Sequence, residues 1–174
     1  MRTVTYGAAA SLDGYIARPD GAVDWLHWSD DVGAIMKEFW KGIDTILMGR
    51  KTWEVSVAMG GGGGMMKGMR GYLFSRTMSE SPEGMELVSE DAGAFVRRLK
   101  EQDGKGICMM GGGELARSFF EADVIDEVGA NVHPVLLGTG IPLFPPMQRQ
   151  VNLEMIENRS LAGGCAYLRY RVVR

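Results

Sequence analysis

The stretch Thr45–Glu54 (TILMGRKTWE) joins a buried strand directly to a helix. Its first half belongs to the apolar, β-branched run Asp44–Gly49, whose length is typical of a strand covered on both faces. The helix begins after Gly49, and its first turn carries two cations and a hydroxyl, Arg50, Lys51 and Thr52. Positive side chains at a helix N-terminus are unfavourable because they oppose the helix dipole, and a bound anion would offset this cost. The alternative is that the helix simply begins with solvated basic residues.

A second strand-to-helix junction consists of glycine. The apolar run Ile107–Met110 leads into Gly111, Gly112, Gly113 and Glu114, after which a helix carries Leu115 and further apolar residues. Backbone without side chains can approach a ligand closely, and the N–H groups of the first helical turn face an anion. For a single glycine triplet, a tight turn or a close helix–sheet contact is the alternative. Two such junctions at the carboxyl ends of strands together predict a dinucleotide whose pyrophosphate they hold.

The segment after a third strand, Tyr72–Ser75, bears on the identity of this dinucleotide. Arg76 offers a guanidinium there, and Ser75 and Thr77 offer hydroxyls. These are the donors that a ribose 2′-phosphate prefers, so the segment favours NADPH over NADH. A surface loop with one arginine is the alternative.

Strands and helices alternate through most of the chain. Further strands are predicted at Thr3–Ala10, Met85–Val88 and Val124–Val132, and further helices at about Val32–Ile43, with Ser29, Asp30 or Asp31 as its N-cap, and Asp91–Gln102. The chain ends in a predicted hairpin from Val151 to Val173 whose turn contains Gly163 and Gly164. We therefore expect an α/β fold of three layers, with a mostly parallel central sheet and an antiparallel C-terminal hairpin.

Two segments are predicted to be loops. Tyr15–Gly21 follows the first strand and contains the turn residues Pro19 and Asp20. The five consecutive glycines Gly60–Gly64 indicate a flexible loop, with a flap over the site as the alternative.

Size and composition restrict the class of protein. The 174 residues, 45% hydrophobic and 24% charged, predict a single globular domain over residues 1–174. A formal net charge of −3 with scattered Lys and Arg argues against a nucleic-acid partner, and no stretch is long and apolar enough to span a membrane. Two lone cysteines, Cys108 and Cys165, and the absence of a leader segment predict a cytoplasmic protein.

No motif for metal or nucleophilic catalysis is visible. His27 and His133 are isolated in the sequence, and there is no H-x-E or C-x-x-C element of a zinc deaminase. The chemistry is therefore expected to come from a bound cofactor.

Five segments together resemble the dihydrofolate reductase-like superfamily, and in particular the reductase domain of the bifunctional riboflavin-biosynthesis deaminase/reductase and its stand-alone relatives. They are AAASLDGYIA (Ala8–Ala17), TILMGRKTWE (Thr45–Glu54), YLFSR (Tyr72–Arg76), CMMGGGEL (Cys108–Leu115) and PVLLGTGIPLF (Pro134–Phe144). The resemblance extends through nearly the whole chain, in the same order and spacing.

The resemblance implies a set of cofactor-binding residues. Ala8, Ala9 and Ile16 would border the nicotinamide, and Ser75 with Arg76 would receive the 2′-phosphate. The phosphates would be held by Gly49, Arg50, Lys51 and Thr52 from one junction and by Gly111, Gly112, Gly113, Glu114 and Leu115 from the other.

The catalytic acid is where the sequence departs from folate reductases. Those enzymes carry a carboxylate on the helix before the TILMGR-like strand, whereas Gly33 lies nearest that position here. Asp31, one possible N-cap of that helix, and Asp13, in an Asp-Gly turn, are the candidate proton donors, with bound water as the third source. Trp25, Trp28 and Trp53 are candidates for stacking on a planar substrate.

These observations predict an NADPH-dependent oxidoreductase that transfers hydride to a C=N or C=O group of a small heterocycle, as in 5-amino-6-(5-phosphoribosylamino)uracil reductase. Dihydrofolate reduction is one alternative, and a nucleotide-binding module without turnover is another. The final hairpin carries Tyr167, Leu168 and Tyr170, which makes a homodimer plausible.

Overall fold

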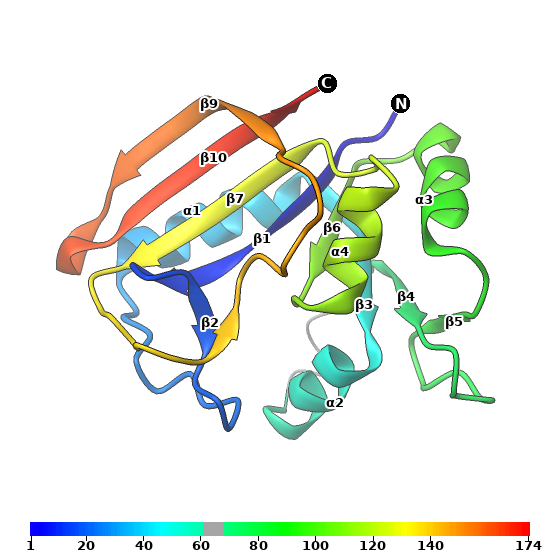
Figure 1. Ribbon diagram of the computed structural model, residues 1–174, viewed down its shortest axis with the longest axis horizontal. Helices are drawn as coiled ribbons and strands as arrows, with labels where there is room; N and C mark the ends of the chain where they lie inside the picture. The colour runs from blue at the N-terminus through cyan, green and yellow to red at the C-terminus, as the bar shows by residue number, and fades with distance from the viewer. Residues whose placement is uncertain (61–67) are drawn as a thin grey trace.

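A computed structural model describes residues 1–60 and 68–174. Its central sheet has eight strands in the order β5-β4-β3-β6-β1-β7-β10-β9 (Figure 1). The strands are β1 (Val4–Ser11), β3 (Ile43–Gly49), β4 (Arg70–Phe74), β5 (Glu86–Val88), β6 (Gly106–Met110), β7 (Glu127–His133), β9 (Asn152–Ser160) and β10 (Ala166–Val173). Neighbours from β5 to β7 are parallel, while β10 is antiparallel to both β7 and β9. The predicted α/β fold with an antiparallel C-terminal hairpin is confirmed.

Helices cover both faces of the sheet. They are α1 (Asp30–Lys41), α2 (Arg50–Ala58), α3 (Ala92–Glu101) and α4 (Glu114–Glu121), followed by the short 3-10 turn η1 (Ala162–Gly164) in the final hairpin. In Figure 1, α3 and α4 lie side by side in front of the sheet, and α1 runs behind β1 and β7. This arrangement follows from parallel strands, which need crossover helices and bury both faces.

The N-terminus of α1 is capped by one of the three residues that the sequence offers for this role. The Ser29 hydroxyl accepts the Val32 N–H at 3.3 Å, so Ser29 is the N-cap of α1. The aspartates Asp30 and Asp31 lie in its first turn, where negative charge suits the helix dipole. The side of α1 that faces the sheet is apolar and includes Val32 and Ile35, both buried.

The main core lies between the sheet and the helices α3 and α4. It is built from apolar side chains of alternating strand positions, including Val4, Tyr6, Leu47, Ile107 and Met109, together with Phe119 of α4. A second cluster, with Ile46, Met48 and Leu73, occupies the other face of β3 and β4. Two separate apolar faces explain why these strands contain nearly continuous apolar residues.

One predicted loop contains a strand. The segment β2 (Tyr15–Ala17) pairs antiparallel with β8 (Ile141–Pro142), which lies within the Pro- and Gly-rich stretch after β7. The prediction of a loop over Tyr15–Gly21 is therefore wrong at its start. Both partners are too short and too far apart in sequence for alternation to reveal the pairing.

The remaining predictions about loops and surfaces have different outcomes. Gly60 ends the turn after α2, whereas Gly61–Gly64 lie outside the described residues. In the described ranges, 1–60 and 68–174, no helix is long and apolar enough to cross a membrane. The hairpin residues Tyr167, Leu168 and Tyr170 are half-buried, and a homodimer stays a prediction.

Candidate functional site

The two strand-to-helix junctions lie against each other. They follow adjacent parallel strands, β3 and β6, whose last paired residues are Met48 and Met110. A Cβ added at Gly111 would lie 2.1 Å from the Thr52 hydroxyl, and one at Gly49 would lie 3.8 Å from the Leu115 side chain. Residues from the start of α2 and the start of α4 therefore meet at one edge of the sheet.

The backbone conformation of this turn favours glycine. Gly111 and Gly113 have φ values of +94° and +72°, in the left-handed region that other residues adopt at a cost. A Cβ at Gly113, the N-cap of α4, would meet no heavy atom within 4 Å, so the backbone there faces open space. Exposed N–H groups at a helix start, next to open space, fit a pyrophosphate.

The β2–β8 pair forms the neighbouring wall of this turn. A Cβ at Gly112 would lie 3.2 Å from the Pro142 carbonyl oxygen and 3.4 Å from the Ile16 side chain. Ile16 thus lies beside the glycine turn. Ala8 and Ala9, on β1, line an apolar cavity that Gly111 also lines.

A polar cluster extends the edge toward β4. Arg50 Nη1 donates to the Thr77 hydroxyl at 3.3 Å, and the Ser75 hydroxyl lies 3.4 Å from the same oxygen. Arg50 also forms an exposed pair with Glu54 at 3.6 Å. Arg76 is exposed in the same turn. Thr77, one of the two hydroxyls predicted as donors to the 2′-phosphate, thus contacts both Arg50 and Ser75.

Three further predicted phosphate-site residues lie on the first turns of the two helices. Lys51 and Glu114 are exposed, and Thr52 is half-buried against the glycine turn. The exposed carboxylate of Glu114 lies beside the N-cap Gly113, where it suits the helix dipole in the absence of an anion.

An apolar cavity of about 270 Å³ opens between α1 and the sheet, next to this edge. Its walls are apolar side chains of α1, strand residues of β1, β6 and β7, and the loop before α1. The lining residues that matter for the site are Thr5, Gly7, Ala8, Ala9, Leu26, His27, Trp28, Val32, Ile35, Met36, Phe39, Cys108, Gly111, Gly129, Asn131, His133 and Tyr167. Such a cavity suits a planar, largely apolar group with a few polar atoms.

The floor of the cavity is bare backbone at its centre. Gly7 of β1 and Gly129 of β7 are paired across the two strands. A Cβ at Gly7 would lie 2.2 Å from the Gly129 carbonyl oxygen, whereas one at Gly129 would meet only the Leu168 carbonyl oxygen, at 4.0 Å. Gly7 is thus needed for close strand packing, and Gly129 keeps the cavity open.

The three candidate tryptophans have different surroundings. Trp28 lines the cavity and is 74% exposed. Trp25 is buried and packs edge-on against His133, with ring centroids 5.4 Å apart. Trp53 packs against the second core cluster. Only Trp28 of the three lies where a substrate ring could stack on it.

Each candidate carboxylate accepts backbone N–H groups of a neighbouring loop. Asp13 accepts the N–H groups of Leu137 and Gly138, at 3.1 and 2.7 Å, and the Ser11 hydroxyl at 2.6 Å. The Ser11 hydrogen bond, followed by the two backbone bonds, holds the pKa of Asp13 below its usual value against a partial desolvation. These contacts tie the β1–β2 turn to the loop after β7.

Asp31 has an equivalent backbone contact. Its carboxylate accepts the Ala162 N–H at 3.0 Å and connects α1 to the final hairpin. Neither Asp13 nor Asp31 lines the cavity, so the geometry gives no support to either as the proton donor. The reason is that each carboxylate satisfies backbone donors of a neighbouring loop.

The two histidines, isolated in sequence, lie together at the cavity wall. The His27 main-chain N–H donates to His133 Nδ1 at 3.1 Å, and the two rings stack with centroids 6.0 Å apart and an interplanar angle of 23°. His133 is 1% exposed, and its Nε2 lies 3.2 Å from the Asn131 carboxamide. Burial, with a smaller contribution from His27, lowers the pKa of His133. A separation of 106 residues left no local signal from which to predict this pair.

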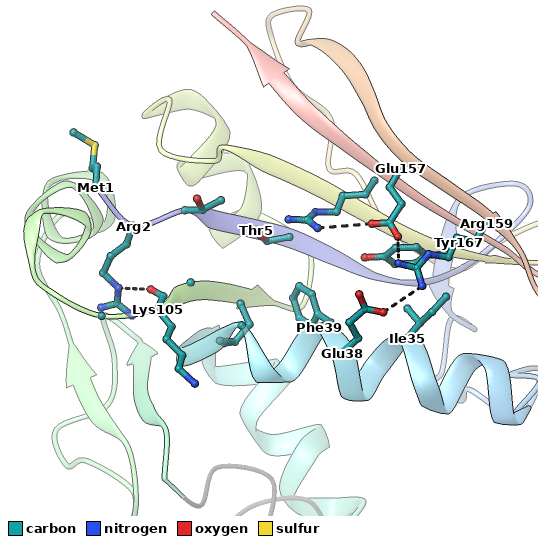
Figure 2. A pocket seen from close by; sticks show the side chains of 16 residues that line it. Met1, Arg2, Thr5, Ile35, Glu38, Phe39, Lys105, Glu157, Arg159 and Tyr167 are labelled. Carbon is teal, nitrogen blue, oxygen red and sulfur yellow. Dashed lines mark hydrogen bonds and ion pairs between the residues drawn. The ribbon is translucent and has the colours of Figure 1, made fainter.

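A second, more polar cavity of about 500 Å³ lies further along α1 (Figure 2). Thr5, Ile35, Phe39 and Tyr167 line both cavities. Figure 2 shows Arg159 of β9 reaching toward α1, where its guanidinium is 3.2 Å from the Glu38 carboxylate. Glu157 pairs with the same guanidinium. The charged groups at this end are therefore largely paired with one another.

The fold and the paired glycine junctions define a protein of the dihydrofolate reductase-like class. Dihydrofolate reductase from Enterococcus faecalis, determined with NADP(H), has the same fold, with a TM-score of 0.70 at 16% identity over 99% of this chain and 97% of that one. The family model of the RibD C-terminal domain matches residues 2–167 of this chain, and the chain belongs to this family.

Two further relatives cover almost the entire chain. The uncharacterized protein YyaP of Bacillus subtilis (strain 168) is 31% identical over 180 residues, which span 98% of this chain and 95% of YyaP. A protein from Shewanella sp. PV-4 that carries a provisional assignment to riboflavin biosynthesis superposes with a TM-score of 0.82 at 26% identity, over 99% of both chains.

Proposed function

We propose that this protein is an NADPH-dependent reductase that transfers hydride to a C=N or C=O group of a small planar heterocycle. Membership of the RibD C-terminal domain family implies oxidoreductase activity of the riboflavin-pathway type. The observation that carries the proposal is the contact between the two glycine junctions directly beside the apolar cavity. A dinucleotide held by both junctions would have its reactive end next to a site for a planar substrate.

Each part of the site has a distinct role in this proposal. The backbone at Gly49 and Gly111–Gly113, with the first turns of α2 and α4, would bind the pyrophosphate. Arg50, Ser75, Arg76 and Thr77 would bind the 2′-phosphate. NADPH, when bound, supplies the hydride.

The protein itself contributes position and exclusion of water. Ala8, Ala9 and Ile16 would border the nicotinamide, since small residues on β1 let a flat ring approach the backbone. Val32, Met36 and Phe39 form an apolar wall opposite the bare floor at Gly7 and Gly129. This wall would hold a planar substrate against the cofactor and keep bulk water from the reacting atoms.

Reduction of 5-amino-6-(5-phosphoribosylamino)uracil is the form of this activity that the family supports best. Dihydrofolate reduction has less support, because the cavity side of α1 presents Val32, Ile35 and Met36 and no carboxylate. A binding module without turnover would share the cofactor site but not the reaction.

The test is to follow the absorbance of NADPH with the purified protein and each candidate substrate, the aminouracil and dihydrofolate, in separate reactions. We expect oxidation with the aminouracil and little with dihydrofolate. NADPH binding without oxidation across both substrates and related pyrimidines would contradict the reductase and support the module.

A further inference from the structure

The cavity contains few side chains that can exchange a proton. Among the described residues that line it, none is Asp, Glu, Lys or Arg, and the titratable ones are His27, Cys108, His133 and Tyr167. Burial raises the pKa of Cys108 to about 12 and also raises the pKa of Tyr167. General acids work best when their pKa lies near the working pH, so the imidazoles are the better candidates.

His133 is held in one protonation state by its hydrogen bonds. Its Nδ1 accepts the His27 main-chain N–H at 3.1 Å, so the proton of the neutral ring is on Nε2. Asn131 Nδ2 lies 3.2 Å from Nε2, and two donors cannot bond each other, so the carboxamide is assigned with its oxygen toward the ring. This orientation also gives a partner to the Asn131 Oδ1 atom, which is otherwise buried without one. Cys165 Sγ lies 3.5 Å from Nδ1, on the side away from Asn131. With both nitrogens engaged and the ring buried, a positive charge on His133 is disfavoured.

The His27 ring has the opposite surroundings. It is exposed at the mouth of the cavity and stacks on His133. A positive charge on one ring disfavours a charge on the other, and burial makes His133 the poorer site for it. His27 is therefore the ring of the pair that both lines the cavity and is open to exchange with solvent.

We propose that His27 supplies the proton in the reduction and that His133 is the positioning residue that holds it at the cavity mouth. This inference rests on the proposed reductase function. It assigns to the loop before α1 the role that the carboxylate on the corresponding helix has in folate reductases.

The step balances in atoms and electrons. The substrate carbon accepts the hydride, and the π electron pair moves onto the attached nitrogen or oxygen. That atom takes a proton from the His27 imidazolium, whose neutral form regains a proton from water at the cavity mouth. The substrate is thereby reduced by two electrons and NADPH is oxidised to NADP⁺.

The groups that face the pair from neighbouring elements are limited. Among the described residues, Trp25, Asn131 and Cys165 contact His133 directly. Tyr167, Cys108 and the apolar residues of α1 line the same cavity. The nearest carboxylates in sequence have other partners: Asp24 pairs with Arg18 at 2.7 Å, and Asp31 accepts the Ala162 N–H. Asp30 lies in the first turn of α1. A pH dependence of the reaction is therefore assigned to His27.

The first test measures the pH profile of kcat/KM for the aminouracil with NADPH in wild type, His27→Gln and His27→Ala. We expect wild-type activity to fall as His27 loses its proton. The His27→Gln variant should be about 100-fold slower at neutral pH and should lack this limb of the profile. Added imidazole should restore part of the activity of His27→Ala. Asp24→Asn, in the same loop, is the matched control and should keep the wild-type profile.

The outcome separates the inference from the proposed function. Turnover in His27→Gln with an unchanged pH profile and no rescue by imidazole would overturn the role of His27 and leave the reductase intact. Absence of turnover in the wild-type protein would instead contradict the proposed function.

A second measurement needs no turnover. The chain has only two histidines, so its ¹³C-labelled imidazoles give two ring signals that His27→Gln assigns. We expect the signal that remains in this variant to show the neutral Nε2–H form throughout the neutral range and the missing signal to be the one that titrates in wild type. Titration of His133 in its place would overturn the inference even without a substrate.

Discussion

Gly7 and Gly129 are paired across two strands and have different structural roles. The Gly7 Cβ position is occupied by backbone of the neighbouring strand, and the Gly129 Cβ position is open toward the cavity. In the sequence they are only two small residues within strands, because their pairing depends on the register of β1 with β7.

Replacing these two glycines by alanine should therefore have different effects. Gly129→Ala places a methyl group on the cavity floor and should raise KM for the heterocycle about tenfold or more, with little change in the unfolding temperature. Gly7→Ala should lower the unfolding temperature, because its methyl group would collide with the Gly129 carbonyl. Steady-state kinetics and thermal unfolding of both variants test this, and a stable Gly129→Ala protein with wild-type KM would place the substrate elsewhere.

Arg76 is the residue on which cofactor preference depends in the proposal. Arg76→Ala should weaken NADPH binding by about tenfold, the size expected for a lost charge-assisted hydrogen bond, and leave NADH binding nearly unchanged. Calorimetric titration with both cofactors measures this. Arg171→Ala, at an exposed position on β10, is a control that changes the charge equally. An equal loss for NADPH and NADH would show that Arg76 does not bind the 2′-phosphate.

At the scale of elements, the loop after β7 is tied to the turn after β1 by the Asp13 carboxylate, beside a backbone hydrogen bond in which the Leu12 N–H donates to the Val135 carbonyl oxygen at 2.9 Å. Asp13 accepts two backbone N–H groups from this loop, at Leu137 and Gly138. The same loop leads into β8, which pairs with β2 beside the glycine turn. Ile16, which we propose borders the cofactor, thus lies on a strand whose partner, β8, belongs to the loop that Asp13 holds.

This contact predicts a pH dependence of stability. The pKa of Asp13 is lowered in the folded state, first by the Ser11 hydrogen bond. Its contribution to the free energy of unfolding is therefore complete above the unfolded-state pKa of about 4, and it is lost as the pH falls through the folded-state pKa. Asp13→Asn should lower the unfolding temperature by a few degrees at neutral pH and by less in acid. Thermal unfolding across this pH range tests it, with exposed Asp103→Asn as control. A difference that stays constant into acid would contradict the assignment.

The sequence predicted the elements of this fold better than their contacts. A strand buried on both faces, such as Asp44–Gly49, has a continuous run of apolar residues, and a helix buried on one side, such as α1, has apolar residues three and four positions apart. Both patterns can be read from a short stretch of sequence. The pairing of β2 with β8 and the stacking of His27 on His133 have none, because they join segments more than a hundred residues apart. Asp31 is a candidate acid because it lies on the helix where folate reductases carry theirs, and Asp13 because it lies near the expected nicotinamide edge. The backbone N–H groups that both carboxylates accept come from loops more than a hundred residues away, which no local pattern reveals.

At the scale of the whole molecule, the position of the site follows from strand order. The neighbours β3 and β6 bring the two glycine junctions together, and β1 lies on the other side of β6 and brings Ala8 and Ala9 to the same edge. The α1 helix crosses behind β1 and β7 and covers the cavity (Figure 1). The alternation of strand and helix predicted a parallel sheet but not which strands would be neighbours.

The most direct test of this account is a titration of the ¹⁵N-labelled protein with NADPH, followed through its backbone amide signals. We expect the largest shifts at Gly49, at Gly111–Gly113 and in the turn at Ser75–Thr77, with smaller ones at Ala8 and Ala9. Shifts confined to the polar cavity around Glu38 and Arg159, or none at saturating NADPH, would contradict a cofactor site built from the two glycine junctions.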